Sequence, residues 1–387
     1  MPIESSSLRV LLVAVRYFPY MGGSETHVYE VGRRLARAGV EVTVLTTDVS
    51  GRLPAFEEVD GVRIHRVLAW PTNKDYYFAP AIYRFIARGQ WDLVHCQGYH
   101  SLVPPLAMLA AWRAKLPYVL TFHSGGDVSR LRSLLRGLQR AMLRPLLSRA
   151  RKLIAVSAFE ADFFREQLRL PGEQFVIIPN GAYLPEVPGS AGEATDEVDE
   201  GPLIVSIGRL ERYKGHQRVI AALPKVLELV PNVRVRIAGV GPYESALQKM
   251  ARKLGVAERV EIRPVPPGDR GSMASLLARA DLVTLLSQYE SQGIAVLEAL
   301  ALRRPVLVTA TSALQELADR GLVRTVPLNS TSEAVATAMV DQLRHPLVPP
   351  NVELPMWDDC AANLLALYQT IVQDVTKSIV RGASCVS

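Results

Sequence analysis

Cysteine is scarce in this chain: its 387 residues include three, Cys96, Cys360 and Cys385, which are far apart and show no metal-ligand spacing. This odd, scattered set gives no sign of a disulfide framework, and a reducing cytosol is its simplest setting. The first eight residues lack the basic segment and apolar core of a secretory signal peptide. We therefore expect a cytoplasmic protein.

Long apolar runs are absent as well. The apolar stretch over residues 102–120 is broken by three prolines and two basic residues, so we do not expect it to span a membrane. A hydrophobic content of 49% with 21% charged residues is typical of a globular protein and excludes a disordered or collagen-like chain. Because 387 residues are too many for one ordinary core, the length predicts two domains.

Acidic residues are missing between Asp127 and Glu160, in a chain of net charge +6. The basic residues of this segment are Arg130, Arg132, Arg136, Arg140, Arg144, Arg149, Arg151 and Lys152. Leucines recur at helical spacing among them and predict a helix over residues 129–152, broken near Pro145. No aromatic interleaving or recognised module accompanies the charge, so we do not expect a nucleic-acid partner.

Two interpretations of this helix stay open. A basic, apolar-striped helix suits the surface of an anionic bilayer, and it makes Arg132, Arg136 and Arg140 candidate membrane or acceptor contacts at the inner face of the plasma membrane. An ordinary helix, with its leucines against a sheet and its arginines in solvent, explains the same pattern equally well.

Strands and helices alternate in both halves and predict two doubly wound parallel sheets. In the first half the helix is expected over residues 24–38, with Ser24 as N-cap and Gly39 as stop. The expected strands are residues 8–15, 41–46, 93–96, 118–122, 152–156, 175–178, 203–207, 233–238, 260–262, 282–286 and 306–308.

The segment over residues 186–201 holds six acids, three glycines and one proline without apolar periodicity, which is typical of a linker. We therefore expect domains over residues 1–185 and 202–355. A helical pattern begins at Trp357, and about eight residues at the end of the chain are expected to fray.

The most informative segment is Tyr289-Glu290-Ser291-Gln292-Gly293-Ile294-Ala295-Val296-Leu297-Glu298-Ala299. If Gly293, Ile294 and Ala295 open a helix, their free N–H groups and its dipole form an anion site suited to a diphosphate. Glu290 and Glu298 would then flank that site and accept hydrogen bonds from sugar or ribose hydroxyls. A plain amphipathic helix with solvated glutamates is the alternative.

A second segment, Gly208-Arg209-Leu210-Glu211-Arg212-Tyr213-Lys214-Gly215, follows the expected strand over residues 203–207. Cations just past the carboxyl end of a strand are well placed to hold a diphosphate beside a helix N-terminus. His123 follows another expected strand, and a lone histidine is more often structural. Gly22 and Gly23 suit either a tight turn or close approach of a ligand.

Taken together, these residues resemble the retaining glycosyltransferases of glycosyltransferase family 4, from about Leu8 to Tyr368. The elements that carry the resemblance are residues 19–28, Thr121-Phe122-His123, Val156-Ser157, Ile178-Pro179-Asn180-Gly181, the Arg209/Lys214 pair and the Glu290/Glu298 motif. The resemblance implies a GT-B fold, in which two Rossmann-like domains face a cleft. It also implies an N-terminal acceptor domain, a C-terminal nucleotide-sugar domain, and a terminal helix over residues 356–387 that crosses back to the first domain.

The resemblance assigns roles to the candidate residues. It implies that Arg209 and Lys214 hold the diphosphate, Glu298 the ribose and Glu290 the transferred sugar. His123 is expected near the anomeric centre. The remaining donor-binding candidates are Gly22, Gly23, Gly208, Gly293, Ile294 and Ala295.

The expected reaction is transfer of a hexose from a UDP- or GDP-sugar to a lipid, lipid-linked glycan or polysaccharide, with retention of anomeric configuration. No Asp-x-Asp motif follows an expected strand, so we expect neither a metal nor another cofactor. The alternatives are an enzyme of the same fold with a small soluble acceptor, a phosphorylase, and a sugar-nucleotide-binding protein without catalysis.

Overall fold

The computed structural model of the protein describes residues 7–20, 22–71, 77–124, 130–182, 201–266, 268–350 and 352–384, with backbone alone for 130–135 and 378–384. Residues 186–200 of the expected linker therefore lie outside the described residues. The chain forms two compact units: unit 1 consists of residues 1–180 and 356–387, and unit 2 of residues 181–355.

Unit 1 is built on an eight-stranded sheet of order β3-β4-β2-β1-β5-β6-β7-β8. Its strands are β1 (Arg9–Val13), β2 (Glu41–Asp48), β3 (Phe56–Val59), β4 (Val62–Leu68), β5 (Leu93–Gln97), β6 (Tyr118–Thr121), β7 (Lys152–Ala155) and β8 (Phe175–Ile177). Neighbouring strands are parallel except in the β3–β4 hairpin. The sequence did not predict that hairpin. The central strand β1 pairs with β2 on one side and β5 on the other, so the chain reverses its direction across the sheet at β1.

The helices of unit 1 are α1 (Gly23–Arg37), α2 (Ala81–Arg88), α3 (Val103–Arg113), α4 (Arg130–Leu147), α5 (Ala158–Leu168), the short 3₁₀ helix η1 (Gly172–Gln174) and α12 (Trp357–Ser384). Helix α1 begins one residue early: Gly22 is its N-cap, without a side-chain hydrogen bond, so the expected N-cap role of Ser24 is wrong. Gly39 ends the helix as expected, with φ at +85°. Helix α4 continues through Pro145 without the expected break and ends at Leu147, five residues before the expected end, because β7 begins at Lys152.

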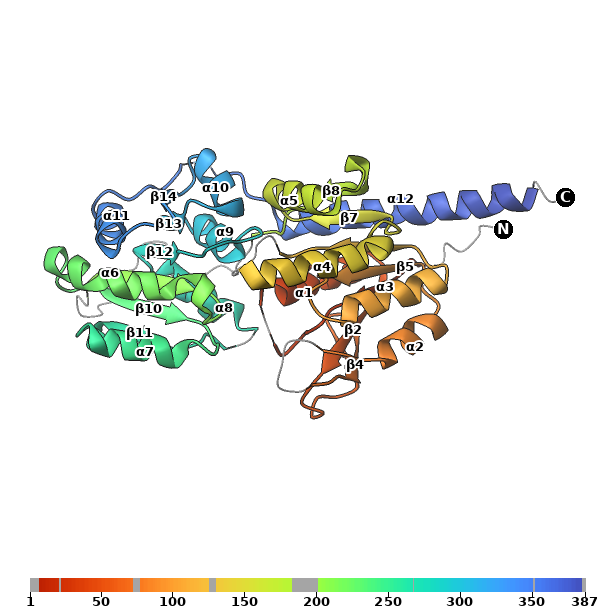
Figure 1. Ribbon diagram of the computed structural model, residues 1–387, viewed down its shortest axis with the longest axis horizontal. Helices are drawn as coiled ribbons and strands as arrows, with labels where there is room; N and C mark the ends of the chain where they lie inside the picture. The colour runs from red at the N-terminus through yellow and green to blue at the C-terminus, as the bar shows by residue number, and fades with distance from the viewer. Residues whose placement is uncertain are drawn as a thin grey trace. The chain divides into compact units, whose positions relative to one another are not determined.

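Helix α12 belongs to unit 1 although it follows unit 2 in the chain, and it is the long blue helix beside the unit 1 elements in Figure 1. Its Trp357 and Tyr368 are fully buried. The Tyr368 hydroxyl lies 2.5 Å from His95 Nδ1 in β5, and Arg34 of α1 pairs with Asp358. The helix continues to Ser384, further than the expected frayed end allows; residues 385–387 lie outside the described part of the chain.

Unit 2 contains a six-stranded sheet, entirely parallel, of order β11-β10-β9-β12-β13-β14. Its strands are β9 (Leu203–Ile207), β10 (Arg234–Ala238), β11 (Val260–Ile262), β12 (Leu282–Leu285), β13 (Val306–Thr309) and β14 (Arg324–Val326). Its helices are η2 (Arg212–Lys214), α6 (His216–Leu229), α7 (Glu244–Lys253), η3 (Ala257–Arg259), α8 (Arg270–Ala278), α9 (Ile294–Ala301), α10 (Ser312–Asp319) and α11 (Ser332–Arg344).

The sheet of unit 2 is covered on both faces, which explains its nearly continuous apolar strands. In β9, Ile204 packs into one core cluster and the next residue, Val205, into the other. The chain runs outward from β9 through β10 to β11 and returns to β12 on the opposite side of β9. Ligands of open parallel sheets bind beyond the carboxyl ends of the strands at such a reversal. We therefore expect the ligand of unit 2 at the ends of β9 and β12.

Within the described residues, no helix combines the length and the apolar character that crossing a membrane requires.

Candidate active site

The loop after β9 carries the first candidate cations. Gly208 has φ at +146°, and η2 places Lys214 directly before Gly215, which adopts a left-handed conformation. A Cβ atom at Gly215 would lie 1.9 Å from the carbonyl oxygen of Leu286, just past β12. Only glycine therefore allows this close approach, which brings the β9 and β12 ends together.

Lys214 and Glu290, which are 76 residues apart in sequence, meet at this point. Lys214 Nζ lies 2.6 Å from Glu290 Oε1, and the Ser287 hydroxyl donates to the same oxygen at 2.7 Å. Both of these contacts use Oε1, so Oε2 keeps acceptor capacity for a ligand hydroxyl. The Tyr213 ring stacks on Tyr289 at 5.1 Å, which holds the two backbone segments side by side.

Arg209 is the more accessible of the two predicted cations. Its side chain is half-exposed, and its ion pair with Glu211 is long, at 3.4 Å. Its carbonyl oxygen accepts a hydrogen bond from His216 Nε2 at 3.3 Å, while Ser206 Oγ lies 2.8 Å from His216 Nδ1. Burial lowers the pKa of His216 to about 4, so this histidine is neutral and anchors the Arg209 backbone. His216 was not predicted from the sequence, although it follows the Lys214-Gly215 pair directly.

The expected helix start at Gly293 is present one residue later. Gly293 is the left-handed N-cap of α9, and the helix begins at Ile294, so the first-turn N–H groups of Ile294 and Ala295 have no acceptor within the helix. A Cβ at Gly293 would meet the Leu314 side chain at 3.1 Å. This N-terminus has the polarity that an anionic ligand requires.

Glu298 is buried in α9 and already has a cationic partner. Arg270, the first residue of α8, donates from Nη2 to Glu298 Oε1 at 2.5 Å. This pair could not be predicted from the sequence, because Arg270 lies 28 residues upstream in a segment without a recognised motif. Hydroxyls of a ribose at Glu298 would have to share the carboxylate with Arg270.

In unit 1, His123 follows β6 and adopts a left-handed backbone with φ at +53°. Its Nε2 lies 2.7 Å from Gln97 Oε1, and its ring meets the edge of His27 at 4.7 Å. Burial holds the pKa of His123 well below its usual value, so the ring is neutral. Since the amide oxygen accepts from Nε2–H, Nδ1 carries the lone pair and is an acceptor.

The two candidate glycines of unit 1 precede α1. Gly22 is extended and Gly23 is the first helical residue. A Cβ at Gly22 would lie 2.8 Å from a carboxylate oxygen of Glu25, so this glycine leaves room for an acidic side chain at the helix N-terminus.

The three arginines proposed for a membrane surface do not share one environment. Arg140 is buried, bonds to Gln167 at 3.0 Å and lies over the Phe163 ring, so its assignment as a surface contact is wrong. Helix α5 covers this position, which helical spacing alone does not show. Arg136 is half-buried, and the side chain of Arg132 lies outside the described residues.

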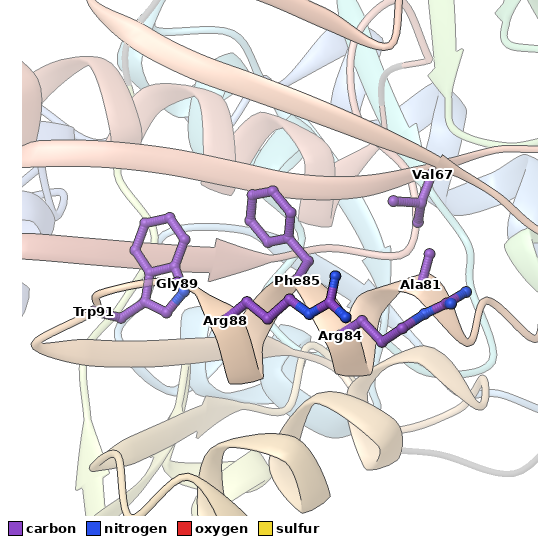
Figure 2. A pocket seen from close by; sticks show the side chains of 7 residues that line it. All are labelled: Val67, Ala81, Arg84, Phe85, Arg88, Gly89 and Trp91. Carbon is purple, nitrogen blue, oxygen red and sulfur yellow. The ribbon is translucent and has the colours of Figure 1, made fainter.

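A separate pocket of about 470 Å³ lies on unit 1, between α2 and β4 (Figure 2). Phe85 and Trp91 stack at its wall with ring centroids 5.7 Å apart, and Arg84 and Arg88 lie one turn apart on α2. None of the residues proposed above as a site residue lines it.

Comparison with known proteins places this arrangement in a family. Residues 21–184 match Glycosyltransferase Family 4, and residues 192–345 match Glycosyl transferases group 1. The chain is 30% identical over 399 residues to the phosphatidyl-myo-inositol mannosyltransferase of Mycolicibacterium smegmatis, covering 97% of each protein. It is 28% identical over 386 residues to the D-inositol 3-phosphate glycosyltransferase of Actinosynnema mirum, covering 90% of this chain and 92% of that protein.

Solved structures show the same fold. Sucrose-phosphate synthase from Thermosynechococcus elongatus has a TM-score of 0.72 at 20% identity, covering 98% of this chain and 100% of that one. The Anabaena protein HepE in complex with UDP and glucose has a TM-score of 0.70 at 18% identity, covering 97% and 100%. The chain therefore belongs to the family 4 type of glycosyltransferases with the GT-B fold, and the predicted family and fold class are confirmed.

Proposed function

We propose that this glycosyltransferase transfers a hexose from a nucleoside diphosphate donor to an acceptor that carries an inositol phosphate group. The observation that carries the donor assignment is the convergence of Arg209, Lys214 and the α9 N-terminus beyond β9 and β12. Two cations and free amides suit the negative charge that develops on a departing diphosphate. HepE was solved in complex with UDP and glucose, and UDP is a nucleoside diphosphate, which supports the same ligand class here.

In this proposal Glu290 binds hydroxyls of the transferred sugar through Oε2 while Lys214 and Ser287 hold Oε1. The ribose hydroxyls donate hydrogen bonds to the Glu298 carboxylate, which Arg270 also contacts. His123 Nδ1 accepts a hydrogen bond from a hydroxyl of the sugar, because Nε2 is already hydrogen-bonded to Gln97. A neutral imidazole suits this role, since it adds no charge beside the reacting centre.

The acceptor class follows from two relatives. One acts on D-inositol 3-phosphate and the other on phosphatidyl-myo-inositol, according to their names. Their common chemistry is an inositol ring with a phosphate, and the two differ in whether a lipid is attached. The acceptor assay must therefore include an inositol phosphate with a lipid and one without.

We further propose retention of anomeric configuration through a front-face route, in which the leaving phosphate accepts the proton of the acceptor hydroxyl. Arg209 and Lys214 supply the positive charge that a metal supplies elsewhere, so transfer is expected to survive excess EDTA. Activity lost with EDTA and restored by Mg²⁺ or Mn²⁺ would contradict metal independence. The anomer formed, determined by NMR of the product, tests retention separately.

A transfer assay tests the acceptor. Donor nucleotides are first ranked by thermal shift, because a ligand of the folded state raises apparent stability with concentration. The donor that binds is then offered with inositol 3-phosphate in solution and with phosphatidylinositol in vesicles. Glycosylation of either supports the proposal and identifies the source of the phosphate. Donor binding with neither product formed, and no slow hydrolysis, would favour a sugar-nucleotide-binding protein without catalysis.

We also propose a peripheral membrane contact at α4 through its exposed apolar side chains. Leu138 and Met142 lie one turn apart and are 61% and 72% exposed. The protein is expected to float with anionic vesicles at low salt, and to float less after the double exchange of Leu138 and Met142 for Ser. Glu166→Gln, an exposed change on α5, is the control. Equal recovery of wild type and double variant would contradict a contact at α4.

A further inference from the structure

Glu160 of α5 is a fully buried carboxyl group that joins two loops of the unit 1 sheet. One oxygen accepts from the Ser124 N–H at 2.5 Å and the other from the Val156 N–H at 2.8 Å. These amides follow β6 and β7, which are neighbours in the sheet. Within the part of the chain that the structure describes, no cation pairs with Glu160. Its two hydrogen bonds are therefore what compensates its burial.

The local sequence offers this glutamate a different partner. Ser157 is the N-cap of α5, and its Oγ accepts from the Glu160 N–H at 3.1 Å. A glutamate three residues after such an N-cap commonly returns the bond to the N-cap amide and completes a capping box. Glu160 instead reaches past Ser157 to Val156 and across to Ser124. The side chain thus ties α5 to the loop that follows β6.

Helix α5 also contacts the first residue of that loop, Phe122, which follows β6 directly. Phe164, one turn after Glu160, stacks on Phe122 with ring centroids 3.7 Å apart and planes 10° apart. Phe122 and Ser124 are the two neighbours of His123 in sequence. One turn of α5 therefore fixes the chain immediately before and immediately after His123.

His123 needs this support because of its backbone. A left-handed φ of +53° is unfavourable for a residue with a Cβ, and it persists where the surroundings impose it. The hydrogen bond to Gln97 orients the imidazole ring through the side chain. Two amides require two acceptor atoms. Both oxygens of a carboxyl group keep lone pairs whether or not the group is protonated, whereas glutamine would present an NH₂ group to one of the amides.

We propose that Glu160 is a positioning residue for the transfer reaction: together with Phe164 it holds the His123 backbone in the left-handed conformation that presents the imidazole to the donor sugar. This inference rests on the proposed role of His123. Glu160 touches neither substrate nor reacting atoms in this account, so its effect on transfer passes through His123.

The first test is spectroscopic and does not depend on activity. Imidazole ¹⁵N NMR of the full-length protein, with the His123 signals assigned from His123→Ala, compares wild type with Glu160→Gln. We expect the His123 signals to shift or broaden while those of His216 in unit 2 stay in place. Unchanged His123 signals in a folded Glu160→Gln protein would overturn the proposal. Phe164→Leu, which weakens the other contact, should move the same signals.

The second test is a double-mutant cycle in the transfer assay. Misplacing a substrate-contacting group costs roughly 10- to 100-fold in rate, so Glu160→Gln should lower kcat by that range with a smaller change in the donor KM. In the His123→Ala background the same exchange should have no further effect. Glu166→Gln, on the exposed side of α5, is the control for the helix.

The outcomes separate the two hypotheses. If His123→Ala transfers at the wild-type rate, the proposed role of His123 fails, while the NMR comparison still tests whether Glu160 positions it. If His123→Ala is impaired and Glu160→Gln costs the same factor in both backgrounds, the role of His123 stands and that of Glu160 is refuted.

Discussion

The pair of Lys214 and Glu290 is expected to affect folding and transfer in separable ways. Nζ and Oε1 are 2.6 Å apart, and the side chains are 16% and 11% exposed. Removing one partner leaves a largely buried charge without compensation, whereas removing both leaves none. We therefore compare Lys214→Met, Glu290→Gln and the double variant.

The magnitude follows from the burial. A fully buried pair costs roughly 3–5 kcal/mol when one partner is removed, and this pair keeps some solvent contact, so we expect each single variant to lose about 2 kcal/mol in its free energy of unfolding. The double variant should regain most of that loss. Transfer should behave differently, because both groups also face the donor: each single variant and the double variant should lose roughly two orders of magnitude in turnover.

Urea unfolding and a purified transfer assay measure the two effects on the same samples. Lys225→Met is the matched control, because its pair with Glu228 has the same 2.6 Å distance but is 48% and 61% exposed. An exposed ion pair is screened by solvent and contributes little to stability, so this variant should unfold nearly as wild type does. A double variant that regains transfer together with stability would show that the pair is purely structural and would refute the site assignment.

Two further predictions concern stability. Gly215→Ala should destabilise unit 2 several-fold more than Gly255→Ala, although both positions have positive φ. A Cβ at Gly215 would lie 1.9 Å from a backbone atom, whereas nothing lies within 4 Å of a Cβ at Gly255. Equal urea midpoints for the two variants would contradict this packing. Burial raises the pKa of Glu160 from 4.5 to about 8, so the native state binds an extra proton between these values and its free energy of unfolding falls as pH rises through that window. The free energy of unfolding of Glu160→Gln should lack this decrease. Parallel pH profiles of the wild type and the variant would refute a raised pKa at Glu160.

Strand positions in unit 2 followed closely from the sequence because a parallel strand buried on both faces leaves a continuous apolar run. The expected strands over residues 203–207 and 260–262 have the observed bounds, and the others differ by one residue at an end. The β3–β4 hairpin and β14 were missed. β3 alternates exposed and half-buried residues, and β14 has the sequence Arg-Thr-Val with one buried residue, so neither has such a run.

The helix start at Gly293 and the cations after β9 could also be predicted, since each depends on local sequence. The partners of those residues could not. Arg270 on Glu298, Ser287 on Glu290 and α5 over Arg140 are tertiary contacts between segments with no shared pattern. The Ser24 N-cap failed for a local reason, because the chain already turns into α1 at Gly22.

The position of α12 has a consequence for the order in which the chain acquires structure. Unit 2 is one continuous segment, whereas unit 1 is divided by it, and the residues that complete unit 1 are synthesised after unit 2. Until Tyr368 has left the ribosome, His95 lacks its buried hydroxyl partner, and the Trp357 indole is missing from the wall beside His27. Unit 2 therefore has all its residues first, and the surroundings of His27, whose ring contacts His123, are complete only when α12 has docked.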